Sequence, residues 1–200
     1  MNDESILFIC NPEANTGRLK KRWPKVQDEL KNTLDSDSYE IKFTESRLHG
    51  MSIAEEAIDS GYKTLISVGG DGTTNEICNA IMKKGKGTNL GILPMGTSND
   101  INLTYGLPLD PIENLKRLLD QNVRKYPIGL LTNDILGDYY FLDHCDCGLA
   151  AQAALSVLNG GSFLKGEIKY TYHDLFCIYI HTFSPNPACR RQTPTLVMWD

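Results

Sequence analysis

The stretch "ISVGGDGTTNEI", residues 66–77, runs from an apolar segment through three glycines and an aspartate into a helical pattern. The apolar segment, residues 64–68, has no polar alternation apart from the small Ser67, which is typical of a parallel strand covered on both faces. Glycines that follow such a strand let the backbone turn tightly and come close to a ligand. The stretch therefore predicts a strand, a ligand-binding turn and a helix in direct succession.

The same alternation of strand and helix patterns extends over most of the chain before residue 122. Hydrophobic periodicity predicts strands and helices in turn: the strands at residues 6–10, 39–44, 64–68 and 90–93, and the helices at residues 18–34, 51–59, 75–84 and 110–121, with a short helix before Gly106. Pro24 should kink or restart the first of these helices. Alternating strands and helices predict an α/β fold with an open parallel sheet.

After residue 122, the sequence pattern no longer alternates between strand and helix. Residues 124–150 suggest two strands around the Asn133-Asp134 turn, in the style of an antiparallel hairpin. Helical patterns return at residues 150–159 and 166–183, and residues 193–200 give a final strand for which the pattern offers no partner. We therefore predict an α/β nucleotide-binding domain at residues 1–124 and a partial, truncated β-rich second domain at residues 125–200. The edge of a truncated domain makes a homodimer a candidate assembly.

Composition restricts the classes of partner. The 200 residues carry a formal net charge of -5, whereas proteins that bind phosphate backbones concentrate Lys and Arg. No apolar run approaches the ~20 residues that a membrane-spanning helix needs. These features argue against nucleic acid and predict a cytoplasmic protein whose contact with a membrane is peripheral.

The six cysteines are scattered and mostly lie in apolar patterns, which predicts reduced structural thiols. Two groups combine histidine with cysteine: His144 with Cys145 and Cys147, and His173 with Cys177. Neither group has the CxxC pair or the paired histidines of the usual zinc sites. The sequence therefore gives little support to a metal site built from these residues.

Three loops with unusual residues follow predicted parallel strands, at residues 11–17, 69–74 and 95–100. The ligand crevice of an open parallel sheet lies at the carboxyl ends of its strands. Thr73 or Thr74 could cap the helix after the first glycine turn, and the amides at its N-terminus favour phosphate. Gly96, with Thr97 and Ser98, repeats this arrangement one strand later.

Either glycine turn alone is equally well explained as a tight connection with good capping residues. The two turns together, each at the end of a parallel strand, favour phosphate binding. The sequence contains neither the GxxxxGK[ST] pattern of a P-loop nor the GxGxxG pattern of nicotinamide-binding folds. The phosphate would therefore be held by a different kind of loop.

The carboxylates in these turns have alternative explanations. Asp71 would repel a polyphosphate unless a divalent cation bridged them, so it suggests a magnesium nucleotide or a role in orienting the acceptor. Asp100 could support that network or simply favour the first turn of its own helix. Glu76 could pair with Thr73 in a capping box or contact nucleotide hydroxyls, and we prefer the capping box.

The motif "GGDGTTNE" at residues 69–76, followed by "GILPMGTSNDIN" at residues 91–102, resembles the catalytic domain shared by diacylglycerol kinases, sphingosine and ceramide kinases and bacterial lipid kinases. Further segments fit the same resemblance and extend it over nearly the whole chain: "NPEANTG" at residues 11–17, "FTES" at 43–46, "YFLDHCDCGLAAQ" at 140–152 and "GEIKYTYHDL" at 166–175. NAD kinases and phosphofructokinases use similar GGDGT loops. The GTSND segment at this distance favours the lipid kinases.

The resemblance implies an N-terminal domain of the phosphofructokinase and NAD-kinase type, followed by a β-sandwich domain, with ATP in the crevice between them. It also implies transfer of the ATP γ-phosphoryl group to a lipid hydroxyl at a membrane surface. Asp71 would lie close to Mg²⁺ and the phosphates, and Asn99 and Asp100 would support that network. The expected nucleotide contacts are Asn11, Thr44, Gly70, Asp71, Gly72, Thr73, Thr74, Asn75, Glu76, Gly96 and Thr97.

The chain departs from the family pattern in two places. Residues 126–129, Tyr-Pro-Ile-Gly, lack the aspartate that usually precedes Leu-Gly in the family. The charged network that would join Asp100 to this aspartate therefore lacks one member. The Asp-Gly-Glu type segment that resembles a general-base site in the family would lie beyond Asp200. Two alternatives to a lipid kinase therefore stand: a non-catalytic nucleotide- or lipid-binding relative, and a kinase of a soluble acceptor such as NAD.

Overall fold

The structure is a computed structural model that describes residues 6–15, 17, 19–119, 123–133, 137–143, 145 and 195–199. Four parallel strands form the centre of the molecule in the order β2-β1-β3-β4. Their bounds are Ile6–Cys10 for β1, Tyr39–Phe43 for β2, Thr64–Gly69 for β3 and Asn89–Pro94 for β4. The predicted open parallel sheet is confirmed, and each strand lies within one residue of its predicted bounds.

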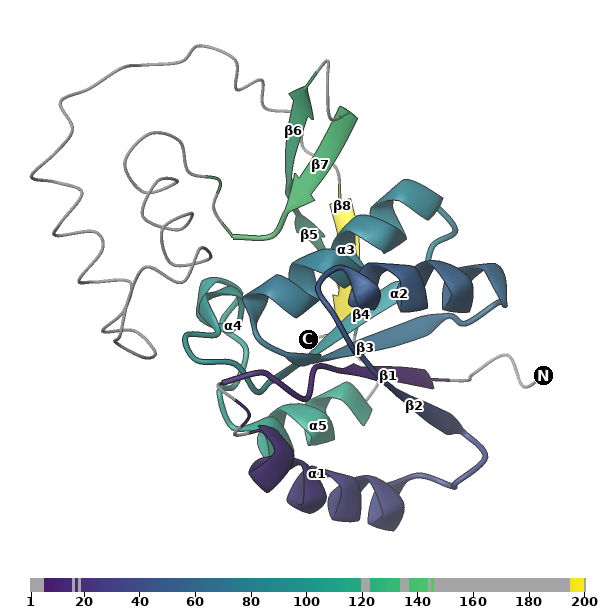
Figure 1. Cartoon of the computed structure of the whole chain (residues 1–200), viewed down its shortest axis with the longest axis vertical. Helices are drawn as coiled ribbons and strands as arrows, with labels where there is room; N and C mark the ends of the chain where they lie inside the picture. The colour runs from purple at the N-terminus through teal and green to yellow at the C-terminus, as the bar shows by residue number, and fades with distance from the viewer. Residues whose placement is uncertain are drawn as a thin grey trace, which may run out of the picture.

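Helices cover both faces of this sheet (Figure 1). The helices α1 (Leu19–Thr33) and α5 (Pro111–Leu119) lie on one face, and α2 (His49–Asp59) and α3 (Asp71–Lys84) lie on the other. Strand β1 contributes alternate side chains to two separate cores: Leu7 and Ile9 pack with α2 and α3, and Phe8 and Cys10 pack with α1 and α5. Burial on both faces explains why the strands are apolar without alternation.

Two further strands extend the sheet beyond β4. Strand β8 (Thr195–Trp199) pairs in parallel with β4 and antiparallel with β5 (Val123–Pro127). The expectation that the final strand lacks a partner is therefore wrong: β8 is an interior strand of a six-stranded sheet. The predicted domain boundary between residues 124 and 125 falls within β5 and stays a prediction.

Strands β6 (Gly129–Asn133) and β7 (Gly137–Phe141) form a separate antiparallel pair around the predicted turn, whereas residues 124–127, expected in the same hairpin, belong to β5 of the main sheet. Figure 1 shows this pair above α3, away from the main sheet. A Cβ atom on Gly129 would lie 2.0 Å from the ring of Phe141, its partner in the register. Only glycine therefore allows the Phe141 ring to lie across the neighbouring strand.

Several helix boundaries differ from those expected. Helix α1 is continuous through Pro24, so the expected restart there is wrong. Helix α2 begins at His49 after Leu48, which adopts a left-handed conformation with φ 63°. Helix α3 begins at Asp71, four residues earlier than predicted, and ends at the left-handed Gly85 as expected. The predicted helices at residues 150–159 and 166–183 lie outside the described residues.

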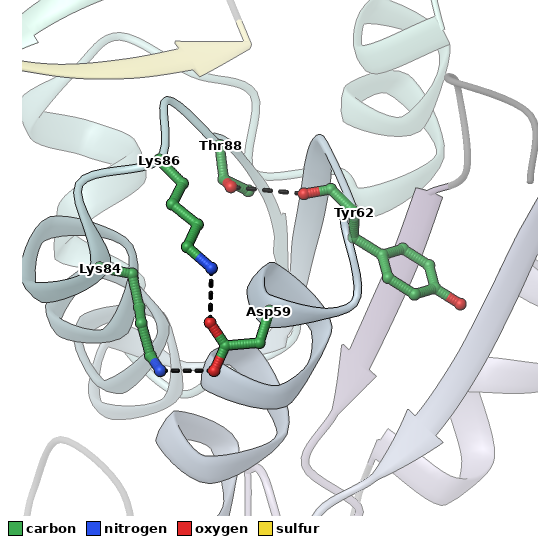
Figure 2. A network of polar contacts seen from close by, with 5 residues as sticks. All are labelled: Asp59, Tyr62, Lys84, Lys86 and Thr88. Carbon is green, nitrogen blue, oxygen red and sulfur yellow. Dashed lines mark hydrogen bonds and ion pairs between the residues drawn. The ribbon is translucent and has the colours of Figure 1, made fainter.

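The C-terminal ends of α2 and α3 are joined by an ion-pair cluster (Figure 2). Lys84 Nζ and Lys86 Nζ lie 2.6 Å and 2.7 Å from the two carboxylate oxygens of Asp59. The two lysine hydrogen bonds lower the pKa of Asp59 to about 2. Beside this cluster, Thr88 Oγ1 donates to the carbonyl of Tyr62 at 3.3 Å. The cluster fixes the end of α3 that lies opposite its glycine turn.

Candidate functional site

The site is positioned by the direction in which two strand-to-helix connections leave the sheet. The chain leaves β1 for α1 and then β2, whereas it leaves β3 for α3 and then β4 on the other side. Connections that diverge in this way open a crevice at the carboxyl edge of a parallel sheet. Across this crevice, Asn11 Nδ2 donates to Thr73 Oγ1 at 3.0 Å. The predicted loops after β1 and β3 therefore meet.

The loops after β3 and β4 also touch, through two glycines. A Cβ atom on Gly96 would lie 2.4 Å from the Cα of Gly70, and a Cβ on Gly70 would lie 3.1 Å from the Cα of Gly96. The loop after β4 is fixed by Asn99, whose Oδ1 accepts from the amide of Gly96 at 2.9 Å. Asn99 itself is left-handed, with φ 56°. The glycines therefore serve a close contact between two backbones.

Thr73 and Thr74 do not cap α3, contrary to expectation. Gly70 is the N-cap residue and makes no side-chain capping bond, so both threonines lie inside the first turns of the helix. Thr74 Oγ1 lies 2.9 Å from Ser67 Oγ and donates to the carbonyl of Gly70 at 3.3 Å. The hydroxyls link α3 to β3 and to the loop after β1, because the helix begins before the residues that were expected to start it.

Glu76 does not form the preferred capping box with Thr73. Its Oε1 accepts from the backbone amide of Leu48 at 3.0 Å, so the carboxylate holds the loop between β2 and α2. At the start of this loop, the amide of Thr44 donates to the carbonyl of Cys10 at 2.8 Å. Glu76 and Thr44 thus come to the same place from segments far apart in the sequence.

These loops surround a cavity of about 340 Å³, which we call the β1 cavity. It brings together several of the predicted nucleotide contacts with residues of the loop after β2. Its lining residues are Asn11, Glu13, Thr44, Glu45, Ser46, Arg47, Gly72, Thr73 and Glu76. The β1 cavity is lined by side chains that can donate and accept hydrogen bonds, at the N-terminal turn of a helix whose amides favour anions.

A second cavity of about 270 Å³, the β7 cavity, lies on the other side of the same helix turn. Its walls combine three carboxylates with aromatic side chains from β7 and with aliphatic side chains from residue 101 and from residue 142, which follows β7. The lining residues are Asp71, Gly72, Asn75, Asp100, Ile101, Tyr139, Phe141, Leu142, Asp143 and Cys145. Gly72 lines both cavities. The two cavities therefore meet at the N-terminal turn of α3.

Asp71 lies at this meeting point. It is the first residue of α3, and its Oδ1 accepts from the amide of Ile101 at 3.1 Å. The bond joins the N-terminal turn of α3 to that of the short helix α4 (Asp100–Thr104). Helix N-termini favour a carboxylate in this place. The carboxylate is therefore fixed in orientation while it lines the β7 cavity.

The described residues contain no group of three or more His, Cys, Asp or Glu side chains that could hold a metal ion by itself. Mg²⁺ in phosphoryl-transfer sites commonly uses one or two carboxylates together with substrate phosphates. Asp71, with Asp100 in the same cavity, fits that donor set. Of the two His and Cys groups in the sequence, only Cys145 lies within the described residues, and it is exposed.

Five of the expected residues line neither cavity: Gly70, Thr74, Gly96, Thr97 and Asn99. Thr97 is exposed and lines neither the β1 cavity nor the β7 cavity. Gly96 is buried against Gly70, so it shapes the loop beneath the site. Of the predicted residues, the structure brings together Asn11, Thr44, Thr73 and Glu76 in one cavity, and Asp71, Asn75 and Asp100 in the other.

The contribution of β7 to the site was not predicted from the sequence. Asn75 Nδ2 donates to the hydroxyl of Tyr139 at 2.7 Å, and the fully buried Asn79 bonds the backbone of Tyr140. The one available signal was Asn79 itself, a polar residue between the apolar Cys78 and Ala80 of the helix pattern. Tyr139 had no such signal, because aromatic residues are common in strands.

Two comparisons establish the family. The profile of the diacylglycerol kinase catalytic domain matches residues 5–131. The chain belongs to the diacylglycerol kinase catalytic domain family. Within this family, the chain is 40% identical over 165 residues to a diacylglycerol kinase of Staphylococcus epidermidis (strain RP62A). The aligned region covers 82% of this chain and 49% of that protein.

A probable lipid kinase, YegS-like, of Chromohalobacter salexigens is 37% identical to this family member over 130 residues, 60% of this chain and 40% of the relative. Among solved structures, a diacylglycerol kinase from Bacillus anthracis str. Sterne matches with a TM-score of 0.56 at 28% identity, over 63% of this chain and 47% of that one. The chain therefore spans about half the length of these relatives or less. None of the described helices is long and apolar enough to cross a bilayer.

Proposed function

We propose that the protein is an ATP-dependent lipid kinase that transfers the γ-phosphoryl group of ATP to the hydroxyl of a diacylglycerol-like lipid. The observation that carries this proposal is the meeting of two cavities at Gly72. A donor in one cavity and an acceptor in the other would bring the phosphoryl group and the hydroxyl together at that turn. Membership of the diacylglycerol kinase catalytic domain family supports a lipid as the acceptor.

The nucleotide would occupy the β1 cavity, with its phosphates toward α3. The amides at the N-terminus of this 14-residue helix supply donors and a favourable dipole for phosphate. Gly70 and Gly72 carry no side chain that would separate the phosphates from these amides. Asn11 and Thr44 supply polar side chains, and Glu76 holds the loop that forms the opposite wall through Leu48.

The acceptor would occupy the β7 cavity. Tyr139, Phe141 and Leu142 give this cavity an apolar wall, while Asp71 supplies a carboxylate beside the helix turn. An apolar wall with a few convergent polar groups suits a ligand that combines a hydrocarbon body with a hydroxyl. No residue of this chain is proposed as the base that takes the hydroxyl proton. Asp71 would orient the reactants, because the hydrogen bond from the amide of Ile101 fixes its carboxylate.

Asp71 and Asp100 would hold the magnesium ion that accompanies the nucleotide. When bound, this ion would neutralise charge on the phosphates during transfer. The carboxylate of Asp71 is suited to this task because the amide of Ile101 fixes one of its oxygens, Oδ1, at 3.1 Å. A negative residue among phosphate-binding glycines is thereby explained.

The two-domain arrangement and the location of the protein belong to the same proposal. Residues 1–124 would form the nucleotide-binding domain, and residues 125–200 would lead into the second, β-rich domain. The separate β6-β7 pair supports a change of architecture after β5. A lipid acceptor would place the protein at the cytoplasmic surface of a membrane, in peripheral contact.

The proposal is tested by incubating the purified protein with Mg²⁺ and γ-labelled ATP, together with diacylglycerol in mixed micelles, with NAD, or with no acceptor. We expect label in the lipid, dependent on the metal. Transfer of the label to NAD would show that the acceptor is a soluble molecule and not a lipid. Binding of ATP without any labelled product would overturn the kinase proposal and leave a nucleotide-binding relative.

A further inference from the structure

An asparagine on α3 pairs with the backbone of β7 in the way that a neighbouring strand would. The side chain of Asn79 is fully buried, at 0% exposure. Its Nδ2 donates to the carbonyl of Tyr140 at 2.8 Å, and its Oδ1 accepts from the amide of Tyr140 at 2.9 Å. A carboxamide offers one donor edge and one acceptor edge, as a peptide unit does. Asn79 therefore fixes the register of β7 against the helix.

The second N–H of Asn79 is also used, because Nδ2 donates to the carbonyl of Asn75 at 2.9 Å. Removing this carboxamide would leave the part-buried backbone groups of Tyr140 without these partners. Buried polar groups that lose their hydrogen bonds are costly. The position is therefore highly specific for a side chain that both donates and accepts.

The face of α3 that carries Asn79 also carries the site. Asp71, Asn75 and Asn79 follow one another at intervals of four residues, which places them in a row along the helix. Asp71 and Asn75 line the β7 cavity, and Asn75 Nδ2 donates to the hydroxyl of Tyr139 at 2.7 Å. Asn79 continues the row where the cavity ends.

On the other side of the β7 cavity, Tyr139 and Phe141 flank Tyr140 in the sequence and supply wall side chains. The end of β7 is also tied to α4, because Thr104 Oγ1 donates to Asp143 Oδ1 at 2.6 Å. The distance from this wall to Asp71 therefore depends on how β7 is docked on α3 and α4. Asn79 provides the buried part of that docking.

We propose that Asn79 is a positioning residue for the acceptor: its bonds to Tyr140 hold β7 so that the wall of the β7 cavity stays opposite Asp71. The acceptor chemistry in this inference rests on the proposed function. The docking of β7 by Asn79 does not depend on that function and can be measured separately. Nucleotide binding in the β1 cavity should be independent of Asn79.

A buried asparagine elsewhere in the fold provides a matched control. Asn114 on α5 is 2% exposed, and its Nδ2 donates to the carbonyl of Ile92 on β4 at 2.7 Å. It lies on the opposite face of the sheet, with α1 and α5. Asn114→Leu therefore removes a buried carboxamide-to-backbone bond without touching β7 or either cavity.

The experiment compares Asn79→Leu and the milder Asn79→Asp with Asn114→Leu in the otherwise unchanged protein. For each variant, kcat and KM for diacylglycerol, the Kd for Mg-ATP and hydrogen exchange at the amide of Tyr140 are measured. We expect the Asn79 variants to lose at least about tenfold in kcat/KM for the lipid, since small displacements of reacting groups are costly. Their Kd for Mg-ATP should be unchanged, and the amide of Tyr140 should exchange faster in Asn79→Leu, which removes its acceptor. Asn114→Leu should alter none of these three quantities.

Two kinds of result would overturn the inference. One is an Asn79 variant that keeps wild-type lipid kinetics, or that loses Mg-ATP affinity to the same degree as lipid turnover. The other is exchange at the amide of Tyr140 that stays slow in Asn79→Leu. If the wild-type protein transfers no phosphate to lipid, the proposed function fails, while the exchange measurement still decides whether Asn79 docks β7.

Discussion

At the scale of single residues, Asp71 has a charge and a hydrogen bond that mutation can separate. Asp71→Asn keeps an oxygen that can accept from the amide of Ile101, as Oδ1 does at 3.1 Å, and removes the negative charge. We expect phosphoryl transfer to fall by about 10²–10³-fold, the range seen when one electrostatic contact to a transition state is lost. The thermal midpoint should stay close to that of the wild type.

The companion variant Asp71→Ala removes both the charge and the bond to α4. It should abolish transfer while the fold persists, which circular dichroism and thermal unfolding can verify. Steady-state assays with labelled ATP compare the two variants. Wild-type turnover in either one would refute the role assigned to Asp71.

The cysteines allow a second prediction at this scale. Burial raises the pKa of the Cys10 thiol and raises that of Cys78 to about 12, so both remain protonated and inaccessible at pH 8. Cys145 is exposed at the rim of the β7 cavity. Native alkylation followed by peptide mass spectrometry should modify Cys145 and spare Cys10 and Cys78. Rapid modification of Cys10 would show that the core around β1 opens.

Prediction from sequence succeeded for the local structure. The strand, the glycine turn and the helix after it were expected in that order and are present, while the catalytic and metal-binding role of Asp71 stays a prediction. Thr73, Thr74 and Glu76 were misassigned as capping residues, because their partners Asn11, Ser67 and Leu48 come from other segments. Side-chain partners across a fold have no signature in the spacing of a single motif.

At the scale of elements, the close approach of the loops after β3 and β4 makes Gly96 irreplaceable. In Gly96→Ala, the new Cβ would lie 2.4 Å from the Cα of Gly70, and backbone cannot swing away as a side chain would. We expect the free energy of unfolding to fall by about 1–3 kcal/mol, as for other overpacked sites. Urea unfolding measures this change.

Gly72→Ala provides the control for Gly96→Ala. A Cβ on Gly72 meets no atom of the described residues within 4 Å, and alanine is favoured over glycine in a helix by about 0.5–1 kcal/mol. Its stability should therefore equal or exceed that of the wild type. Equal destabilisation by the two substitutions would contradict the contact between the loops.

The Asp59 cluster predicts a pH dependence for the packing of α2 on α3. The folded pKa of Asp59, about 2, lies below the usual value of about 3.9 for an unfolded chain. The stabilising contribution is therefore complete above pH of about 4 and is lost as the pH falls toward 2. The stability difference between the wild type and Asp59→Asn should shrink across that window.

Unfolding experiments at pH values from 7 to about 2, at low and high salt, measure this difference. Salt should also reduce it, because the ion pairs are exposed. Lys84→Met should show the same trend, since it removes one of the two partners. A difference that is independent of pH would contradict the ion-pair origin.

The elements themselves were predicted well where burial dictates the pattern. The parallel strands are apolar on both faces, so their bounds were found within one residue. The start of α3 was missed because its N-cap, Gly70, carries no capping side chain. The start of α2 was missed because Leu48 adopts a left-handed conformation that its residue type does not favour.

At the scale of the whole molecule, the sequence pattern did not predict the order of the strands in the sheet. Strand β8 inserts between β4 and β5 although 67 or more residues separate it from β5 in the chain. Its apolar pattern predicted a strand but carried no information about its neighbours. The β7 cavity has the same origin, because it combines α3 and α4 with a hairpin that lies much later in the sequence.

The central claim is that a metal nucleotide binds at the N-terminal turn of α3, between the two cavities. Mn²⁺ can replace Mg²⁺ in the ATP complex and broadens the NMR signals of nearby amides. The 14 residues of α3 span about 20 Å at 1.5 Å per residue, so its two ends are well resolved by this effect. We predict strong broadening at residues 70–74 and little at Lys84 and Lys86. Equal broadening at both ends of α3, or none at its N-terminal turn, would contradict the claim.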